Sequence, residues 1–138
     1  MKDVADLLGR LFIGLIFFYE VIDSILFFEN TKETMIAYGL TWRPGFLLAV
    51  TILILLVGSV LVIIGYNANF GAWLLLLYWV PFTFIVYSFW NDPEVIKRLN
   101  ALYFMRNMAI VGGLLLLISN GAGRYSVKRL IHRLRLPK

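Results

Sequence analysis

The sequence lacks several residue types on which common protein chemistry depends. It contains no cysteine, which excludes disulfides, thiolate metal sites and thiol redox chemistry. It contains a single histidine, His132, which lies in a basic segment near the C-terminus. Haem and transition-metal sites normally need more nitrogen ligands than that, so we expect neither a metal nor an evident cofactor. No P-loop, dinucleotide fingerprint or nucleophile triad is present, and we therefore expect no catalytic activity of the chain on its own.

Charged residues are also scarce. They make up 15% of the 138 residues, whereas hydrophobic residues make up 61%, and the mean hydropathy is +0.83. A soluble domain is normally about half apolar, so this composition predicts a membrane protein, and the length allows one domain. The net charge of +5 then favours anionic lipid headgroups over nucleic acid as a partner.

Apolar segments long enough to cross a membrane occur at about residues 4–28, 46–66, 70–90 and 101–119. A helix needs ~20 residues to cross ~30 Å of hydrocarbon, and it satisfies its own backbone polar groups. The sequence therefore predicts an all-α, polytopic membrane four-helix bundle that occupies residues 1–138 as a single domain. We expect the first segment to be a retained span and not a cleaved signal peptide.

Two shorter helices are expected outside the spans. Asn30 and Glu33 have the spacing of a capping box and Gly39 suits a helix end, which predicts a short interfacial helix after the first span. Residues 124–138 alternate apolar and basic side chains. This pattern predicts a basic amphipathic helix that lies on the surface of anionic lipid.

Four spans place both termini on one side of the membrane. Most of the basic residues flank the termini: Lys2, Arg10, Arg124, Lys128, Arg129, Arg133, Arg135 and Lys138. The opposite side has fewer: Lys32, Arg43, Lys97 and Arg98, with Arg106 just inside the fourth span. The positive-inside rule therefore predicts that both termini are cytoplasmic.

Two carboxylates, Glu20 and Asp23, interrupt the first apolar segment. A charge in hydrocarbon costs roughly 2.5–3.5 kcal/mol on insertion scales, so a compensating group is expected. The two residues share one helix face, and Arg106 in the fourth span lies at a similar depth. If the first and fourth spans are neighbours, the planar guanidinium can pair with either acid or with both.

Further polar and aromatic residues are expected at the same level: Asn107, Tyr19, Tyr87 and Trp90. Two interpretations of this charge cluster remain open. It is either a buried ion pair that fixes helix register, or the lining of an outward-opening cavity for a lipid headgroup, a quinone or a small solute. Pro81 should kink the third span, which serves either helix packing or a wider cavity.

Three sequence blocks resemble the DoxX family of small four-helix membrane proteins. They are RLFIGLIF from Arg10, SFWNDPE from Ser88, and FMRNMAIVGGLL from Phe104 with NGAGRYSVKR from Asn120. The resemblance implies the four-helix fold and a location in the bacterial inner membrane. Its relatives include a subunit associated with a thiosulfate:quinone oxidoreductase, a member of a complex with superoxide dismutase and a sulfurtransferase, and a eukaryotic protein similar to a cargo receptor.

Three functions follow as hypotheses. The first is a non-catalytic accessory or anchoring subunit of a membrane complex with a redox or stress-related role. The second is a protein that binds or transports a lipid, quinone or small solute through a polar cavity in the outer leaflet. The third is a subunit of a quinone-linked oxidoreductase. Membrane lipids are the expected partners, a protein partner and a homo-oligomer are left open, and nucleic acid is not expected.

Overall fold

The computed structural model describes residues 1–135, and within them every regular element is a helix. The helices are α1 Lys2–Leu26, α2 Phe28–Ala37, α3 Pro44–Ile64, α4 Ala68–Val86, the short 3₁₀ helix η1 Phe89–Asn91, α5 Glu94–Asn120 and α6 Val127–Arg135. The predicted all-α class is confirmed. The last residues of the predicted C-terminal helix, 136–138, lie outside the described residues.

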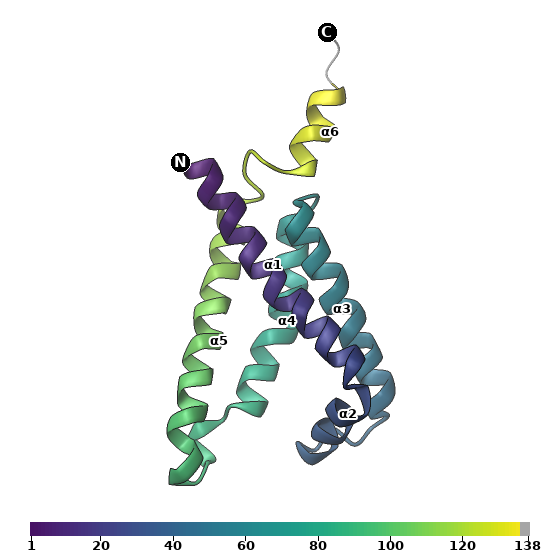
Figure 1. The fold of residues 1–138 in the computed structure, drawn as a ribbon, viewed down its shortest axis with the longest axis vertical. Helices are drawn as coiled ribbons and strands as arrows, with labels where there is room; N and C mark the ends of the chain where they lie inside the picture. Colours follow the sequence, from purple (N-terminus) through teal and green to yellow (C-terminus); the bar gives the residue numbers. More distant parts are fainter. Residues whose placement is uncertain (136–138) are drawn as a thin grey trace.

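The long helices α1, α3, α4 and α5 run up and down as a bundle (Figure 1). α3 packs against both α1 and α4, and α4 packs against α5. α1 and α5 approach each other at the start of α1 and diverge toward the other end (Figure 1). The start of α1 and α6 lie at one end of the bundle, and α2 lies at the opposite end, here called the α2 end.

The core forms where α1, α3, α4 and α5 meet. Phe17, Leu55, Leu75 and Leu114 are fully buried, and the ring of Trp79 is nearly so. Phe17 meets Trp79 edge to face with the ring centroids 4.9 Å apart, an arrangement that aromatic pairs favour beyond the area they bury. These contacts fix how α1 lies across α3 and α4.

Glycines allow α3 and α4 to approach each other closely. A Cβ atom on Gly71 would lie 2.8 Å from the carbonyl oxygen of Gly58 and 2.9 Å from Cβ of Leu61. Small residues at such crossings are the usual means by which membrane helices pack, because packing contacts replace the missing hydrophobic drive. At Gly58 and Gly71, α3 and α4 therefore pack with their backbones in close contact.

Three of the helical segments are long and apolar enough to cross a membrane: α3, α4 together with η1, and α5. α1 does not qualify alone, since Arg10, Glu20 and Asp23 interrupt its apolar sequence. α1 and α2 qualify together, although they are bent by 96° relative to each other. Residues 1–135 therefore contain three such spans, or the four predicted if the bent pair counts as one.

Several boundaries differ from those predicted. The fourth span was expected over 101–119, but α5 begins at Glu94 and forms one continuous helix to Asn120. The third was expected over 70–90 and agrees with the span Ala68–Asn91, although this span is divided into α4, which ends at Val86, and η1. The short interfacial helix is present, but it begins at Phe28, so Asn30 lies within the helix and does not cap it.

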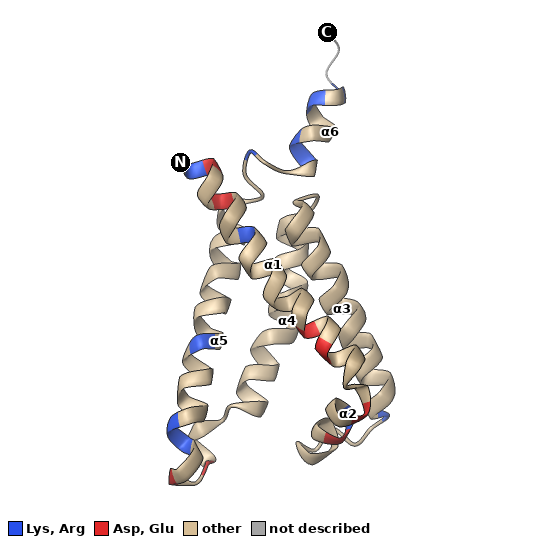
Figure 2. Cartoon of the chain, in the orientation of Figure 1, with Lys and Arg blue, Asp and Glu red and all other residues tan. Residues whose placement is uncertain are grey.

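Basic residues gather at the end of the bundle that carries α6, and acidic residues lie mainly along α1 and at the α2 end (Figure 2). Arg124 pairs with Asp3 across 3.5 Å, which connects the segment after α5 to the start of α1. Both terminal segments thus lie at the same end, as four spans would place them. That this end is cytoplasmic stays a prediction.

Candidate functional site

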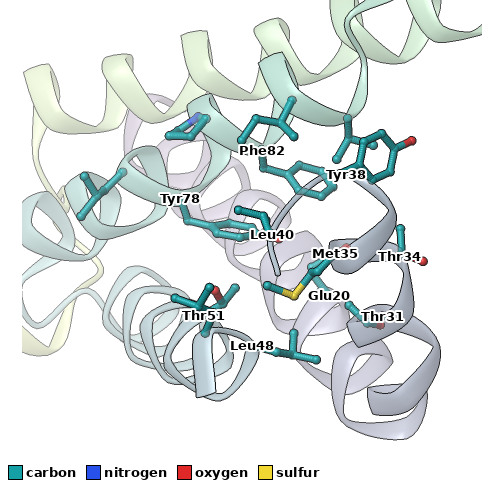
Figure 3. Close-up of a pocket in the computed structure, with 15 residues that line it drawn as sticks. Glu20, Thr31, Thr34, Met35, Tyr38, Leu40, Leu48, Thr51, Tyr78 and Phe82 are labelled. Atoms are coloured by element: carbon teal, nitrogen blue, oxygen red, sulfur yellow. The ribbon is translucent and has the colours of Figure 1, made fainter. Parts of the chain in front are cut away.

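A cavity of about 280 Å³ opens at the α2 end, between α1, α2, α3 and α4. Figure 3 shows its lining. The polar lining residues are Glu20, Thr31, Thr34, Tyr38, Thr51 and Tyr78. Its apolar walls are Met35, Leu40, Leu47, Leu48, Leu77, Pro81, Phe82, Ile85 and Val86. An apolar cavity with a few polar groups is the usual form of a small-molecule site.

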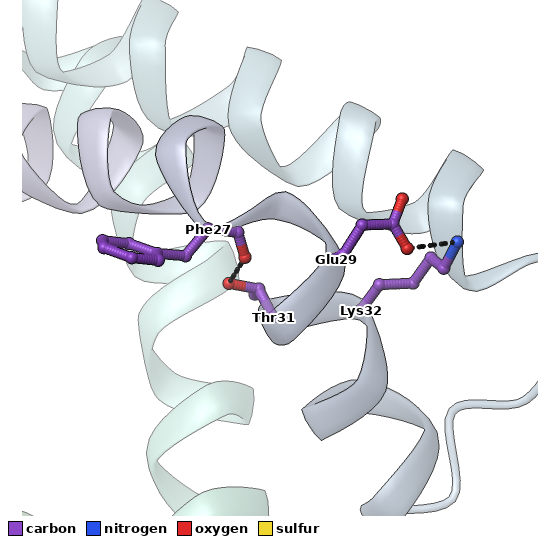
Figure 4. A network of polar contacts seen from close by, with 4 residues as sticks. All are labelled: Phe27, Glu29, Thr31 and Lys32. Atoms are coloured by element: carbon purple, nitrogen blue, oxygen red, sulfur yellow. Dashed lines mark hydrogen bonds and ion pairs between the residues drawn. The ribbon is translucent and has the colours of Figure 1, made fainter.

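The sharp bend between α1 and α2 creates one wall of this cavity. α1 ends at Leu26 and α2 begins at Phe28, so a single residue, Phe27, separates the two axes. The Phe27 carbonyl accepts hydrogen bonds from the Thr31 backbone N–H at 2.9 Å and from Thr31 Oγ1 at 3.0 Å (Figure 4). An exposed ion pair of 3.1 Å between Lys32 and Glu29 lies on the same turn. These contacts begin α2 directly after the bend, and Thr31, Thr34 and Met35 of α2 line the cavity.

Pro81 lies inside α4 and contributes to the opposite wall. Proline has no backbone N–H, so it leaves a helix carbonyl without its usual partner and disturbs the preceding turn. The structure places this proline in the same cavity lining as Glu20. Of the two interpretations of Pro81, its position agrees with the one in which it shapes a cavity beside an acidic residue.

Three of the six polar groups in the cavity offer only hydrogen-bond acceptors, whereas the hydroxyls of Tyr38, Thr51 and Tyr78 can both donate and accept. Glu20 supplies a carboxylate, which in its ionised form can accept hydrogen bonds but cannot donate them. Thr31 Oγ1 donates its hydrogen to the Phe27 carbonyl, and Thr34 Oγ1 donates its hydrogen to the Asn30 carbonyl at 2.9 Å. Both threonine hydroxyls therefore offer only oxygen lone pairs to anything in the cavity.

Asp23 and Tyr19 lie on α1 near Glu20 but are not part of the cavity lining. Asp23 is half-buried one turn after Glu20. Tyr19 is 68% exposed and points away from the bundle core. Of the predicted cluster, the structure thus brings only Glu20 into the cavity.

The remaining predicted residues gather between α4 and α5. Asn107 is buried and its Nδ2 donates to Thr83 Oγ1 at 3.2 Å. Arg106 is exposed, with its guanidinium carbon 5.6 Å from the ring centroid of Tyr103. The ring of Tyr87 lies tilted beside that of Tyr103, with the centroids 5.4 Å apart. Trp90 belongs to a neighbouring aromatic group with Phe84, Phe89 and Phe104.

The expected ion pair between Arg106 and the α1 acids is not formed. The ion pairs found within residues 1–135 are Lys32–Glu29, Lys97–Glu94 and Arg124–Asp3. The reason is the splay of α1 and α5, which touch through Ile13 and Gly113 near the other end of the bundle. The pairing assumed that neighbouring helices stay adjacent along their whole length, and that assumption was wrong.

Sequence reasoning missed the polar contacts of Arg10. Its side chain is only 3% exposed, and it donates from Nη1 to the Ala122 carbonyl at 3.0 Å and from Nη2 to the Tyr125 carbonyl. It also packs on Gly65, whose φ of +72° suits glycine. An arginine inside the first apolar segment was the available signal, since a buried guanidinium needs acceptors.

The part of the chain that the structure describes contains no group of three His, Cys, Asp or Glu residues able to hold a metal ion. The candidate site consists of a cavity with one carboxylate and several hydroxyls in its lining. Such an arrangement can bind and orient an amphipathic molecule. It offers an acceptor-rich polar region beside aliphatic and aromatic walls.

The sequence matches the profile described as DoxX over residues 5–88. It is 30% identical over 133 residues to a protein named inner membrane protein YqjF of Escherichia coli, and the match covers 96% of each chain. It is 38% identical over 69 residues to a surfeit locus protein 4 homolog of Schizosaccharomyces pombe, which covers 49% of this chain and 23% of that protein. No solved structure matches the chain.

Proposed function

The chain belongs to the DoxX family of membrane proteins, and we propose that it binds a small amphipathic molecule in the cavity beside Glu20. The observation that carries the proposal is the composition of the cavity lining. One carboxylate and several hydroxyls share a cavity of about 280 Å³ with aliphatic and aromatic side chains. A lipid, a quinone or a small amphipathic solute has both kinds of surface, and each is a candidate occupant.

The half-buried position of Glu20 in the cavity wall supports a binding role. A carboxylate inside an apolar segment loses hydration, and within residues 1–135 no ion pair compensates it. Intramembrane ionisable residues of this kind usually mark ligand or ion pathways. A ligand that hydrogen-bonds to Glu20 would supply the missing partner.

The test is occupancy of the cavity when its volume is reduced. Thr51 lines the cavity from α3, so Thr51→Phe should fill part of it. Thr41 lies exposed outside the lining, and Thr41→Phe is the matched control. Each protein is extracted from its membrane into nanodiscs without added ligand, and bound small molecules are quantified by mass spectrometry.

We expect an amphipathic molecule at a stoichiometric level in the unsubstituted protein and in Thr41→Phe, and a loss of most of it in Thr51→Phe. A cooperative thermal unfolding transition in each of the three proteins serves as the control that the cavity variant is folded. Equal amounts of bound molecule in the two variants would refute the proposal. A quinone among the bound molecules would connect the site to redox chemistry supplied by a partner.

An accessory or anchoring role is a second candidate, and α6 favours it. This helix carries Lys128, Arg129, Arg133 and Arg135, and its Leu130 and Leu134 are exposed. It extends beyond the bundle (Figure 1), where basic and apolar residues suit the surface of an anionic membrane or a protein partner. Co-purification of a stoichiometric protein that is lost on deletion of residues 127–138 would support this role.

A further inference from the structure

The acceptor chemistry of the cavity indicates which head group it selects. This inference rests on the proposed function and names the ligand class of the same site. We propose that the cavity binds an amphiphile whose polar head is a primary ammonium group. The ammonium would lie on Glu20, and the hydrocarbon would lie against the apolar walls.

The negative charge of the cavity lining favours a cationic head group. Glu20 is the one ionisable acid of the lining, and no Lys, Arg or His of residues 1–135 lines the cavity. Lys32 on α2 is already engaged with Glu29 at 3.1 Å. Asp23, one helical turn from Glu20, adds negative potential from the same helix. A cationic head is therefore attracted to the cavity, and an anionic head is repelled.

The hydrogen-bonding groups of the lining favour a primary ammonium over a quaternary one. The hydrogens of the Thr31 and Thr34 hydroxyls are directed to backbone carbonyls, so these side chains can only accept from a ligand. The hydroxyls of Tyr38, Thr51 and Tyr78 can accept as well as donate, so they add further acceptors for a donor head group. A primary ammonium carries three N–H donors and no acceptor, which complements a carboxylate with nearby hydroxyl oxygens. A quaternary ammonium has the same charge but no N–H group and cannot make these bonds.

The size and the apolar walls of the cavity suit a head group together with the start of a hydrocarbon chain. Leu40, Leu48 and Phe82 are among the aliphatic and aromatic residues that line the cavity together with the polar groups (Figure 3). The cavity is too small for a whole phospholipid, and it accommodates a head group and the first part of a chain. The remaining hydrocarbon would extend into the lipid at the open side.

The experiment uses the full chain in nanodiscs of pure phosphatidylcholine, which contains no primary amine. A photoactivatable long-chain primary amine labels the protein, and peptide mapping locates the label. Dodecylamine, dodecyltrimethylammonium, dodecanol and laurate are compared as competitors at equal membrane concentration. Glu20→Gln removes the proposed partner, and Glu33→Gln, an exposed acid outside the lining, is the matched control.

We expect the label on cavity residues and competition by dodecylamine at roughly tenfold lower concentration than by the other compounds, as charged hydrogen bonds imply. Glu20→Gln should abolish this preference, whereas Glu33→Gln should keep it. Equal competition by dodecyltrimethylammonium or dodecanol would overturn the inference and leave the binding function intact. Absence of label from the cavity would overturn both.

The source of the amine is distinguished by adding phosphatidylethanolamine to the nanodiscs. Competition by this lipid at mole fractions of a few per cent identifies a lipid head group as the ligand. If only the free amine competes, the ligand is a single-chain amphipathic amine. Either result supports selection of a primary ammonium, and the inference falls if neither competes.

Discussion

Arg10 is expected to contribute most of the connection between α1 and the segment before α6. Arg10→Met keeps the aliphatic stem and the approximate volume but removes both donors to the carbonyls of Ala122 and Tyr125. A hydrogen bond from a charged donor contributes ~1.5–3 kcal/mol. The lower value applies here, because Tyr125 is 55% exposed and water can replace part of the contact. Two such bonds then give a loss of about 3 kcal/mol in the free energy of unfolding.

Arg124→Met provides the matched control for this change. Arg124 lies at the same end of the bundle, but its side chain is 59% exposed and its pair with Asp3 spans 3.5 Å. Exposed ion pairs contribute at most about 1 kcal/mol, so the control should change stability little. Unfolding in mixed micelles, followed by tryptophan fluorescence, measures both free energies.

Hydrogen exchange adds a local measurement. In Arg10→Met the backbone amides of residues 121–126 should exchange faster, because the segment loses its attachment to α1. A free energy of unfolding for Arg10→Met that lies within about 1 kcal/mol of the values for the unsubstituted protein and for Arg124→Met would refute this role of Arg10. Unchanged exchange in this segment would contradict it independently.

Two other substitutions test the packing and the corrected charge cluster. Gly71→Ala should destabilise the bundle by about 1–3 kcal/mol, because the added Cβ would lie 2.8 Å from the backbone oxygen of Gly58. Gly112→Ala is the control, since no atom lies within 4 Å of its added Cβ. It should be neutral or slightly stabilising in the same unfolding assay. Arg106→Met should cost less than about 1 kcal/mol, since it loses a contact over Tyr103 and no ion pair. A loss of several kcal/mol for Arg106→Met would show that the guanidinium does pair with an acid.

The candidate site was only partly predictable from the sequence. Glu20 was identified because a carboxylate in an apolar segment is costly wherever the segment lies. Its neighbours were not identified, since Thr34 and Thr51 are ordinary residues until α2 folds back beside α3. The rise per residue gives the depth of Glu20 and Arg106 along their helices. The sequence contains no direct information on how far apart two helices lie at that depth.

The amino-acid sequence by itself determined that the chain is a helical membrane protein with a short helix after its first apolar segment. A segment in hydrocarbon must have apolar side chains and must satisfy its backbone polar groups internally, and a helix does so with residues that are close in the sequence. Only the tertiary structure decided that Arg10 is buried, that Arg106 faces outward and that Glu20 lines a cavity. These outcomes depend on crossing angles set by contacts such as Gly58 with Gly71, which join residues distant in the sequence.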